Sequence, residues 1–495
     1  MAGKIQVNTK DNYRPTFHFT IDGLGFPGDP NAMFFADGRF HMMYVYDRGN
    51  EDYCWGHVST TDFVHWHRHC DALTPDENDN GIYSGGVYLD GEKAYVLYWA
   101  LGRQKGKGGI RLAFSEGPLF EKWIKDDHYA IASTELGVVE VPSAAAGYQS
   151  YRGCADPSNI WKSGTHYFAQ LGNLCALNKN RDNRSAPQTA KGDWSELIVS
   201  EDLHHWRYLH RFYQRRQDNS WTGVEDDNMC PVFLPLTNAS GTREYLEMFL
   251  SHNVGAQYYL GEYDETQQIF QPRFFGRLSM ADNVFFAPEM ATLPDGRVLL
   301  IGWLRDNIDD DLARERALGW SGVHTLFREV SLSENNVLEF APLKEYSALR
   351  GTGVCLSISS LRETEVPLFG GHVEVCFETK SAASFHFVYD HGDGHYSEIG
   401  FDEEKGEIYL DTRFSGSAGR KIRDFMKTGS RSVNHLQFFI DGPCLDLFFD
   451  GQALCRRVFA PESSISQPRL LLVGEGQAIE GNAYPMNPIL IEGEK

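Results

Sequence analysis

Positive charge, patterned cysteine and long hydrophobic runs are all scarce in this chain of 495 residues. There are 46 Lys and Arg residues against 68 Asp and Glu residues, which gives a formal net charge of −22. Nucleic acids and anionic membranes are bound by basic faces, so we expect neither as a partner. No apolar run is long enough to span a membrane, and residues 1–7 lack the apolar core of a signal peptide. We therefore expect a soluble cytoplasmic protein, or a secreted one if a signal peptide has been removed.

The nine cysteines are scattered, and no two of them have the Cys-x-x-Cys spacing of a zinc site. Their odd number and irregular spacing also give no sign of a disulfide framework. The acidic run Asp226-Asp227-Asn228 has neither the glycine nor the distal glutamate of a calcium-binding loop. The sequence therefore predicts no metal and no cofactor.

Helical periodicity is also rare, whereas short aromatic and β-branched runs broken by tight turns are frequent. This pattern is typical of all-β proteins. A strand, a tight turn and a second strand recur five times, at residues 35–44, 88–98, 160–169, 236–246 and 293–303. Several strands per repeat at this spacing are typical of a β-propeller, so we predict one with five blades.

From about residue 349 this repeat disappears, and closely spaced short strands take its place. They lie at residues 373–378, 385–389, 406–410 and 436–440. Such spacing is typical of a β-sandwich. The predicted architecture is thus all-β, with a five-bladed β-propeller over residues 1–347 followed by a C-terminal β-sandwich over residues 348–495.

Two Asp-Pro steps, at Asp29 and at Asp156, each open a predicted strand. Proline has no backbone N–H and biases the residue before it toward extended geometry, so each carboxylate is held in a fixed direction. Asp-Pro is also a common turn dipeptide. Two carboxylates held in the same manner are nevertheless what a sugar-cleaving site needs, one to react and one to orient or tune it.

Motifs that follow one another along nearly the whole chain carry a family resemblance. Gly28-Asp29-Pro30-Asn31 matches a Trp-Met-Asn-Asp-Pro-Asn-Gly motif, and Cys154-Ala155-Asp156-Pro157 matches an Arg-Asp-Pro motif. Further matching segments lie at residues 40–44, 55–57, 61–66, 83–85, 229–236, 286–289, 301–303, 320–322 and 411–416. In this order they resemble glycoside hydrolase family 32, the β-fructofuranosidase, invertase and fructanase group.

The resemblance implies that Asp29 is the nucleophile of a retaining glycosidase and that Asp156 stabilises the transition state. Sugar pockets are shaped by aromatic faces and a few polar groups. The substrate contacts that we expect on these grounds are Trp55, Tyr83 and Ser84 in the pocket, with Asp282 and Glu289 at the leaving-group sugar. Core packing remains an alternative for Trp55, as does a structural role for Asp282 and Glu289.

Three residues depart from the family's pattern, and each removes a polar group from the expected sugar site. Gly28 stands in place of Asn, Ala155 in place of an Arg that contacts fructose, and Met229 in place of the acid/base Glu. A missing donor to a buried sugar hydroxyl costs on the order of 1–3 kcal/mol. The substrate sugar, or its pose in the site, can therefore differ from the usual fructosyl case.

Met229 cannot donate a proton, so a glycosidase of this kind needs another acid. Along an extended strand, the side chains of Asp227 and Glu225 would share a face with Met229. Asp227 is nearer, about 6–7 Å back by strand rise, whereas Glu225 has the longer side chain and is the residue type that the family uses. Such an acidic run is also typical of a solvated loop. We favour Asp227 slightly over Glu225 as the catalytic acid, and Glu289 is the next candidate.

Three functions are compatible with these observations. The first is a retaining glycosidase or transglycosylase acting on β-fructofuranosides or fructo-oligosaccharides. The second is a glycosidase of the same propeller clan for another furanoside or a difructose-type sugar, and the third is a carbohydrate-binding homologue whose catalysis has decayed. The presence of both Asp29 and Asp156 argues against decay. The partner in each case is a small-molecule or oligosaccharide sugar, and the sequence carries no signal for an oligomeric state.

Overall fold

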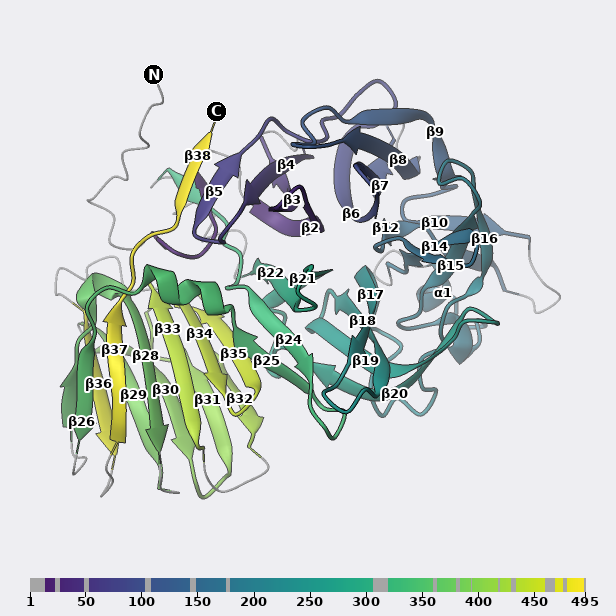
Figure 1. Ribbon diagram of the computed structural model, residues 1–495. Helices are drawn as coiled ribbons and strands as arrows, with labels where there is room; N and C mark the ends of the chain where they lie inside the picture. Colours follow the sequence, from purple (N-terminus) through teal and green to yellow (C-terminus); the bar gives the residue numbers. More distant parts are fainter. Residues whose placement is uncertain are drawn as a thin grey trace.

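Strands make up nearly all of the regular structure. The computed structural model describes residues 14–22, 27–48, 53–102, 108–142, 148–174, 179–305, 319–358, 363–379, 383–392, 394–416, 419–428, 433–458, 468–474 and 479–493. The helical elements in these ranges are α1 (Lys179–Asp182) and the short 3₁₀ turns η2 (Gln188–Ala190), η3 (Lys344–Leu349) and η4 (Phe369–Gly371). The prediction of an all-β protein is confirmed (Figure 1). No helix in the described ranges has the length and apolarity needed to cross a membrane.

Five separate sheets, whose consecutive strands pair antiparallel, follow one another along the first two thirds of the chain. The first contains β2 (Pro27–Ala36), β3 (Arg39–Asp47), β4 (Tyr53–Thr60) and β5 (His65–Arg68), and the second contains β6 (Gly81–Asp90), β7 (Lys93–Leu101), β8 (Gly108–Glu116) and β9 (Ile124–Ala132). The third contains β12 (Ala155–Pro157), β13 (Trp161–Ser163), β14 (His166–Gly172), β15 (Glu196–Ser200) and β16 (Trp206–Arg211).

The fourth and fifth sheets complete this part of the molecule. The fourth contains β17 (Met229–Thr237), β18 (Arg243–Ser251), β19 (Gly255–Asp264) and β20 (Ile269–Arg277), and the fifth contains β21 (Phe285–Thr292), β22 (Val298–Leu304), β24 (Arg328–Leu332) and β25 (Leu338–Pro342). Two smaller pairings join β1 (Ile21–Asp22) to β23 (Trp320–Ser321) and β10 (Val138–Val141) to β11 (Ser150–Gly153).

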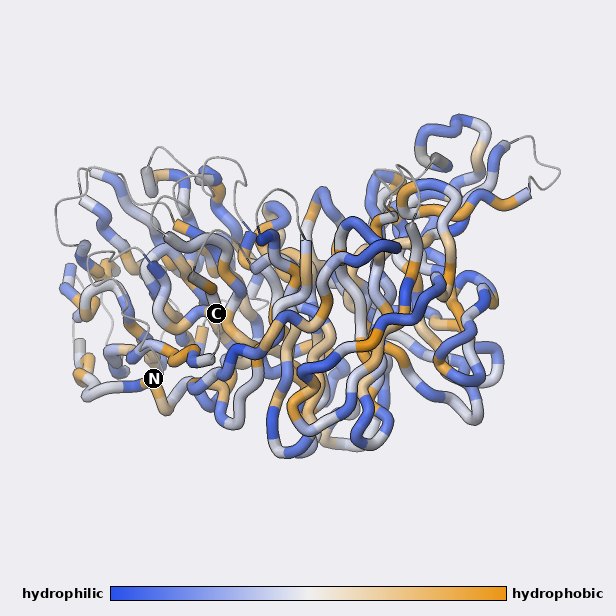
Figure 2. The backbone as a smooth tube through the Cα atoms, turned by 90° about the horizontal axis from the view of Figure 1, so that it is seen from above, coloured by the Kyte–Doolittle hydropathy of each residue, from blue (hydrophilic) through white to orange (hydrophobic). Residues whose placement is uncertain are grey.

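The local sequence explains the hairpins that build these sheets. Between β2 and β3, Asp37 and Gly38 have φ angles of 49° and 75°. Two positive φ angles in succession are typical of a type I′ turn, whose twist matches that of the flanking strands, and Asp-Gly adopts it readily. Figure 2 shows that hydrophilic stretches are concentrated in such turns at the periphery of the molecule.

The first strands of the five sheets meet around a common centre. Strand β2 lies against β6, β6 against β12, β12 against β17, β17 against β21, and β21 against β2, which closes a ring (Figure 1). A bulge or register shift interrupts the pairing of each of these five strands with its neighbour in its own sheet. Because a bulge redirects the side chains beside it, each of the five strands that meet in this ring presents some side chains out of the regular alternation.

The C-terminal part consists of two six-stranded sheets. One has the order β26 (Val354–Ile358), β37 (Ile479–Pro485), β28 (His372–Thr379), β33 (His435–Asp441), β34 (Cys444–Phe449) and β35 (Gln452–Arg457). The other has the order β27 (Glu363–Val366), β36 (Arg469–Gly474), β29 (Phe385–Gly392), β30 (His395–Asp402), β31 (Glu407–Asp411) and β32 (Arg423–Lys427). Alternate residues of β29 are buried, and side chains of both sheets share one apolar core. This arrangement is that of a sandwich.

The two parts are joined more closely than a division at residue 347 suggests. The predicted boundary falls within η3, but β38 (Leu490–Gly493) leaves the sandwich and pairs in parallel with β5 of the first sheet. Asp441 of the sandwich accepts hydrogen bonds from the backbone N–H groups of Thr16, Phe17 and His18 at 2.7–2.9 Å. The domain limits stay a prediction. Strand β38 lies within residues 348–495 by number but pairs with a sheet of the first domain.

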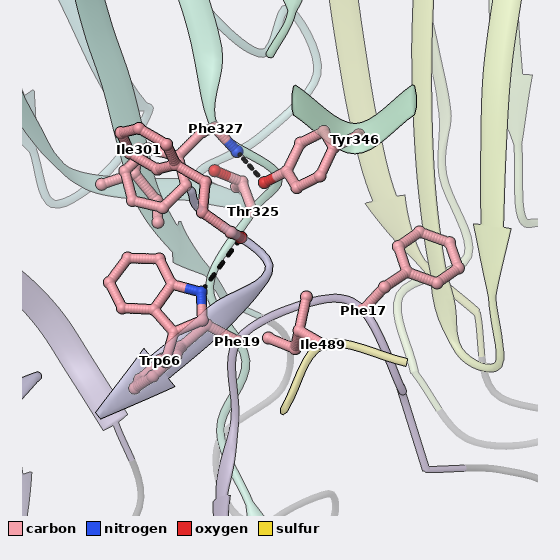
Figure 3. A pocket seen from close by; sticks show the side chains of 9 residues that line it. Phe17, Phe19, Trp66, Ile301, Thr325, Phe327, Tyr346 and Ile489 are labelled. Atoms are coloured by element: carbon pink, nitrogen blue, oxygen red, sulfur yellow. Dashed lines mark hydrogen bonds between the residues drawn. The ribbon is translucent and has the colours of Figure 1, made fainter. Parts of the chain in front are cut away.

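A small apolar cavity lies where these segments meet (Figure 3). The polar groups beside it are engaged: the Trp66 indole N–H donates to the carbonyl of Phe63 at 3.1 Å, and the backbone N–H of Phe327 donates to the Tyr346 hydroxyl at 2.9 Å. Trp66 and Phe327 stack with their ring centroids 6.0 Å apart. The cavity is therefore a feature of the hydrophobic junction, and it contains none of the predicted site residues.

Candidate active site

Two aspartates, a serine and a cysteine come together from four of the bulged strands. Ser84 Oγ on β6 donates to Asp29 Oδ2 on β2 at 2.6 Å. Cys230 Sγ on β17 lies 3.8 Å from the same oxygen and 3.4 Å from Asp156 Oδ2 on β12. The backbone N–H of Cys230 also donates to Asp156 Oδ2, at 3.3 Å. Cys230 thus bridges the two carboxylates that the Asp-Pro steps predicted as a pair.

The backbone around Asp29 is fixed by its neighbours. The Asn31 amide donates to the carbonyl of Asp29 at 2.8 Å and accepts from the backbone N–H of Gly85 at 3.0 Å, so it ties β2 to β6. A Cβ atom at Gly85 would lie 2.0 Å from the carbonyl oxygen of Leu97, so glycine is needed there. Both side-chain contacts of Asp29 fall on Oδ2, and within the described residues Oδ1 makes no hydrogen bond.

Burial raises the pKa of both carboxyl groups. For Asp156 burial acts first and the charge of Asp29 adds to it, which raises the pKa from 3.8 to about 7. For Asp29 burial also raises the pKa, while the Ser84 hydroxyl and the charges of His252 and Arg305 oppose the rise. Asp156 is only 4% exposed, whereas Asp29 is partly exposed. Asp29 is therefore the more accessible member of the pair.

His252 interacts electrostatically with the carboxylate pair and is held by Asp227. It follows the last residue of β18, and Asp227 lies two residues before the start of β17, so the two face each other at one end of the hairpin. Asp227 Oδ2 is 2.7 Å from His252 Nδ1, and Asp227 Oδ1 accepts the backbone N–H of His252 at 2.8 Å. Burial opposes a charge on His252, but Asp227, Asp156 and Asp29 together outweigh it and raise its pKa.

A cation and two aromatic rings form another side of the site. The Arg305 guanidinium lies 4.3 Å from the ring centre of Phe286 and 5.8 Å from that of Trp303. Phe286 packs edge-on against the His252 ring with centroids 5.6 Å apart. Burial and the nearby Arg420 lower the pKa of Arg305 to about 10, against the opposing charge of Asp29. Arg305 is thus a cation close to Asp29.

The pocket residues expected from the resemblance divide into two groups. Ser84 contacts Asp29 directly, and Tyr83 is half-buried beside Trp99, with ring centroids 5.3 Å apart. Trp55, in contrast, is 0% exposed and donates its indole N–H to the carbonyl of Tyr83 at 3.0 Å. The structure therefore places Trp55 in the core beneath the pocket strand instead of on the pocket wall.

The acidic run before Met229 is not an extended strand. Strand β17 begins at Met229, and Glu225 is an exposed residue of a turn, so alternation along a strand does not relate the two. Asp227 is buried and bonded to His252. Met229 is 2% exposed and packs in an apolar cluster. No carboxylate stands at the family's acid/base position, and the roles of Asp227 and Glu225 stay predictions.

Asp282 and Glu289 lie in different surroundings from the carboxylate pair. Both oxygens of Asp282 accept from Arg456, at 2.7 and 3.0 Å, and Oδ2 also accepts from Arg420 at 2.8 Å. These residues connect the ring of sheets to the sandwich. Burial raises the pKa of Glu289 on β21 well above its usual range, and no hydrogen bond in the described part of the chain joins it to Asp29. A sugar contact by either residue stays a prediction.

The other two departures are also visible in the structure. Ala155 is fully buried next to Asp156 on β12. A Cβ atom at Gly28 would lie 3.6 Å from the Val45 carbonyl oxygen and 3.9 Å from the Trp303 ring, so Trp303 flanks the place where the family has an Asn. The surroundings of Asp29 on this side are aromatic.

Among the described residues, one group of side chains comes close enough together to hold a metal ion. His41, His57 and His69 offer nitrogen atoms within 4.8 Å of one another. His41 Nδ1 and His57 Nε2 are 3.0 Å apart, while the rings of His57 and His69 stack at 4.2 Å with an interplanar angle of 19°. Nitrogen lone pairs on stacked rings run side by side instead of converging, and burial lowers the pKa of His41 to about 3. The group fits a stacked neutral cluster, and the absence of a metal stays a prediction.

Sequence reasoning missed three residues of this site: Cys230, His252 and Arg305. Cys230 had a usable signal, because it precedes Pro231 just as Asp29 and Asp156 precede their prolines. His252 and Arg305 had none, since a single residue after a strand belongs to no repeated pattern.

Comparison with known proteins identifies relatives of the whole arrangement. Residues 18–342 match the family model described as Glycosyl hydrolases family 32 N-terminal domain. A sucrose-6-phosphate hydrolase of Klebsiella pneumoniae is 27% identical over 368 residues, 71% of each chain. A levanase of Bacillus subtilis is 23% identical over 97% of this chain and 71% of its own. A crystal structure of fructan 1-exohydrolase IIa from Cichorium intybus with 1-kestose matches with a TM-score of 0.79 at 17% identity, covering 98% of this chain and 99% of its own.

Proposed function

The chain belongs to glycosyl hydrolase family 32, and we propose that it is a retaining fructoside hydrolase whose nucleophile is Asp29. The observation that carries this proposal is the pair of carboxylates bridged by Cys230 at the centre of the ring of sheets. Two nearby carboxyl groups with unequal surroundings are suited to unequal roles in cleaving a glycosidic bond. Relatives along most of the chain that are named as sucrose-6-phosphate hydrolase and levanase support a fructoside as the substrate.

In this proposal Oδ1 of Asp29 attacks the anomeric carbon and forms a covalent glycosyl-enzyme, which water later releases with net retention. Ser84 and Cys230 hold the other oxygen and fix the carboxylate plane. Asp156 accepts hydrogen bonds from sugar hydroxyls, and these strengthen as the transition state forms. The unequal surroundings support these roles, because Ser84, His252 and Arg305 oppose the rise in the pKa of Asp29, whereas burial and the charge of Asp29 both raise that of Asp156.

We also infer that the five sheets are the blades of one β-propeller. The closed order of contacts among β2, β6, β12, β17 and β21 supports this inference. In such an architecture the bulged first strands surround the central axis, where the carboxylate pair lies. The site then draws one residue from each of several blades, which is why residues far apart in sequence meet there.

A second candidate is a glycosidase for another furanoside or a difructose-type sugar. The observations that favour it are the fully buried Ala155 in place of an Arg and the aromatic flank at Gly28. A site that lacks these two polar side chains leaves hydroxyl groups of a bound fructosyl unit without partners. The two candidates share the same nucleophile and differ in the sugar that it attacks.

Purified protein incubated with a panel of sugars tests both candidates. The panel is sucrose, sucrose 6-phosphate, 1-kestose, levan, a difructose and 4-nitrophenyl α-L-arabinofuranoside, with released sugars measured by chromatography. Reactions in dilute methanol report the stereochemistry, because a retaining enzyme yields methyl β-D-fructofuranoside and the same assay detects transfer. Cleavage of one of the first four sugars is the expected result. Turnover of the arabinofuranoside or difructose alone would support the second candidate, and an α-configured product would overturn retention.

A further inference from the structure

The proposed mechanism lacks a proton donor at the place where the family carries one. Cleavage of an unactivated glycoside needs an acid to protonate the leaving oxygen. Met229 occupies that position and is 2% exposed among apolar side chains. Any proton must therefore come from a group elsewhere in the site.

His252 has the position that such a donor needs. Its ring is bonded to Asp227, which lies three residues before Cys230, the residue that contacts both Asp29 and Asp156. The ring also interacts electrostatically with both carboxylates. Its side chain is 40% exposed, whereas that of Asp227 is only 2% exposed. A substrate can therefore reach the imidazole, while Asp227 is covered.

The contacts of the ring decide which of its nitrogens can act. Nδ1 is bonded to Asp227 Oδ2 at 2.7 Å, and the same carboxylate holds the backbone of His252 through its other oxygen. Nε2, on the opposite side of the ring, has no protein partner within the described residues. A charged imidazole held in this way keeps one proton on the bond to Asp227 and presents the other toward solvent or substrate.

We propose that His252 is the general acid of this enzyme and that Asp227 is the residue that positions it, an inference that rests on the proposed fructosidase function. His252 Nε2 gives its proton to the glycosidic oxygen while the carbon–oxygen bond breaks and Asp29 Oδ1 bonds to the anomeric carbon. The electron pair of the broken bond goes to the departing oxygen, which leaves as an alcohol. Neutral His252 then takes a proton from the water that attacks the glycosyl-enzyme, and Asp29 is released as a carboxylate.

The groups around the imidazole support a charged form. Asp227 faces it from the segment before β17, Asp29 from β2 and Asp156 from β12. The neutral ring of Phe286 on β21 covers another side, and the Arg305 cation lies beyond that ring. Burial opposes the charge, but the three carboxylates outweigh it and raise the pKa of His252. The surroundings of His252 thus favour the protonated imidazole that a donor needs.

This assignment changes the role expected for Asp227 from the sequence. Asp227 both accepts the Nδ1 proton and anchors the backbone of His252, so its two oxygens are already engaged by one residue. Glu225 is an exposed residue of the turn before Asp227. The imidazole is thus the acid that contacts the substrate, and Asp227 acts through it.

Two variants, His252→Gln and Asp227→Asn, test the proposal on two substrates. The natural fructoside cleaved fastest in the panel has a poor leaving group, whereas 4-nitrophenyl β-D-fructofuranoside needs no protonation. We expect His252→Gln to lower kcat about 10²–10⁴-fold on the natural sugar, less than about tenfold on the aryl substrate, and to remove the alkaline limb of the pH profile. Asp227→Asn should move that limb to lower pH, and NMR titration of the His252 ring should show the same shift.

The chain offers a matched control in a second Asp–His pair. His205 Nδ1 lies 2.7 Å from Asp202 Oδ2, and both side chains are exposed, at 80% and 51%. His205→Gln and Asp202→Asn should leave both substrates and the pH profile unchanged. Circular dichroism checks the fold, and if His252→Gln is unfolded, the Asp227→Asn pH profile and NMR titration decide.

Several outcomes would overturn the assignment. Equal losses on both substrates, or an intact alkaline limb in His252→Gln, would exclude His252 as the acid. Loss of the limb in Asp227→Asn with normal activity in His252→Gln would make Asp227 the donor. Failure of the wild-type enzyme to cleave any fructofuranoside is a different result, because it would reject the proposed function before any variant is compared.

Discussion

The active site and the junction between the two parts of the protein both bury aspartates, but their surroundings act on the charge in opposite ways. At the junction, burial raises the pKa of Asp282, yet Arg456 and Arg420 outweigh burial and lower it to about 2. At the site, burial and the charge of Asp29 raise the pKa of Asp156 to about 7. The ionised form of an aspartate is thus stabilised at the junction and destabilised at the active site. The difference lies in which charge stands nearest.

His18, at the junction, has a raised pKa like Asp156, but the cause is different. Burial opposes its charge, but Asp441 and Asp446 bind its two ring nitrogens at 2.8 Å and raise the pKa from 6.5 to about 9. Its contribution to stability is present below pH 6.5 and is lost as the pH rises through 9. The raised pKa of Asp156 has the same pH dependence, since the folded state is also destabilised as the pH rises from 3.8 through 7, but here the folded state disfavours the charged form. Charged groups therefore stabilise the folded state at the junction, whereas the buried charge of Asp156 destabilises it at the active site.

Asp29→Asn should have the largest effect of any change at the site. An amide cannot form the glycosyl-enzyme, so we expect activity to fall by about 10⁴-fold or more while the fold is kept. An aryl fructoside should not rescue the variant, because a better leaving group does not replace a nucleophile. Steady-state kinetics on both substrate types, with melting curves, measure this. Near-wild-type turnover would reject the mechanism.

Among changes at the junction, Asp441→Ala should have the largest effect. It should lower the stability of the protein and leave its activity largely unchanged. It leaves His18 buried with one partner fewer and removes the acceptor for three backbone N–H groups. Breaking a buried pair in this way costs about 3–5 kcal/mol. Chemical denaturation at pH 7 measures the loss, and the decline in stability between pH 6.5 and 9 should become smaller in the variant. A change below about 1 kcal/mol would mean that the junction charges contribute little.

Asp156→Asn should change activity and stability in opposite directions. The loss of an anionic acceptor for sugar hydroxyls lowers kcat by about 10²–10⁴-fold. The loss of a buried charge next to Asp29 should stabilise the folded state at pH 8 by on the order of 1–3 kcal/mol, and this gain should shrink toward pH 4. Melting curves at the two pH values test the sign. A uniform loss of stability would show that Asp156 belongs with the junction aspartates.

The smallest expected effect is that of Gly28→Ala. A Cβ atom there makes only ordinary contacts, so a gain of about 0.4–1 kcal/mol from reduced freedom of the unfolded chain is expected. Gly85→Ala, on the neighbouring strand, is the matched opposite, because its Cβ would lie 2.0 Å from the Leu97 carbonyl oxygen. Denaturation of the two variants should give opposite signs. The two variants distinguish a glycine that can be replaced by alanine from one that the close approach of the backbone requires.

The parts of the site that the sequence predicted are those fixed by backbone chemistry. The proline after Asp29 and the proline after Asp156 made the two carboxylates recognisable as a pair, and the structure brings them together through Cys230. Ser84 was expected beside them and donates to Asp29. Strand-and-turn repeats likewise predicted an all-β chain, because turns such as Asp37-Gly38 depend on local φ preferences.

Contacts between distant segments were the part that local patterns could not predict. Trp55 was expected on the pocket wall because it is aromatic, but only the packing of β4 beneath β6 determines that its ring is fully buried. Glu225 was placed on a strand that in fact begins later, at Met229. His252 was not considered at all, since its position depends on the end of one hairpin meeting Asp227 and two carboxylates from other sheets.

The parallel pairing of β38 with β5 has a consequence for how the protein is made. Ribosomes release a chain from its N-terminus, and early domains generally fold while later ones are still being synthesised. The first sheet cannot follow that order, because its outer strand is supplied by Leu490–Gly493. The backbone N–H groups of residues 16–18 likewise cannot form their hydrogen bonds until Asp441 has been synthesised. We expect the nascent chain to carry an incomplete first sheet with an open edge until the last strand emerges, so chaperone dependence should be greatest for chains stalled just before residue 490.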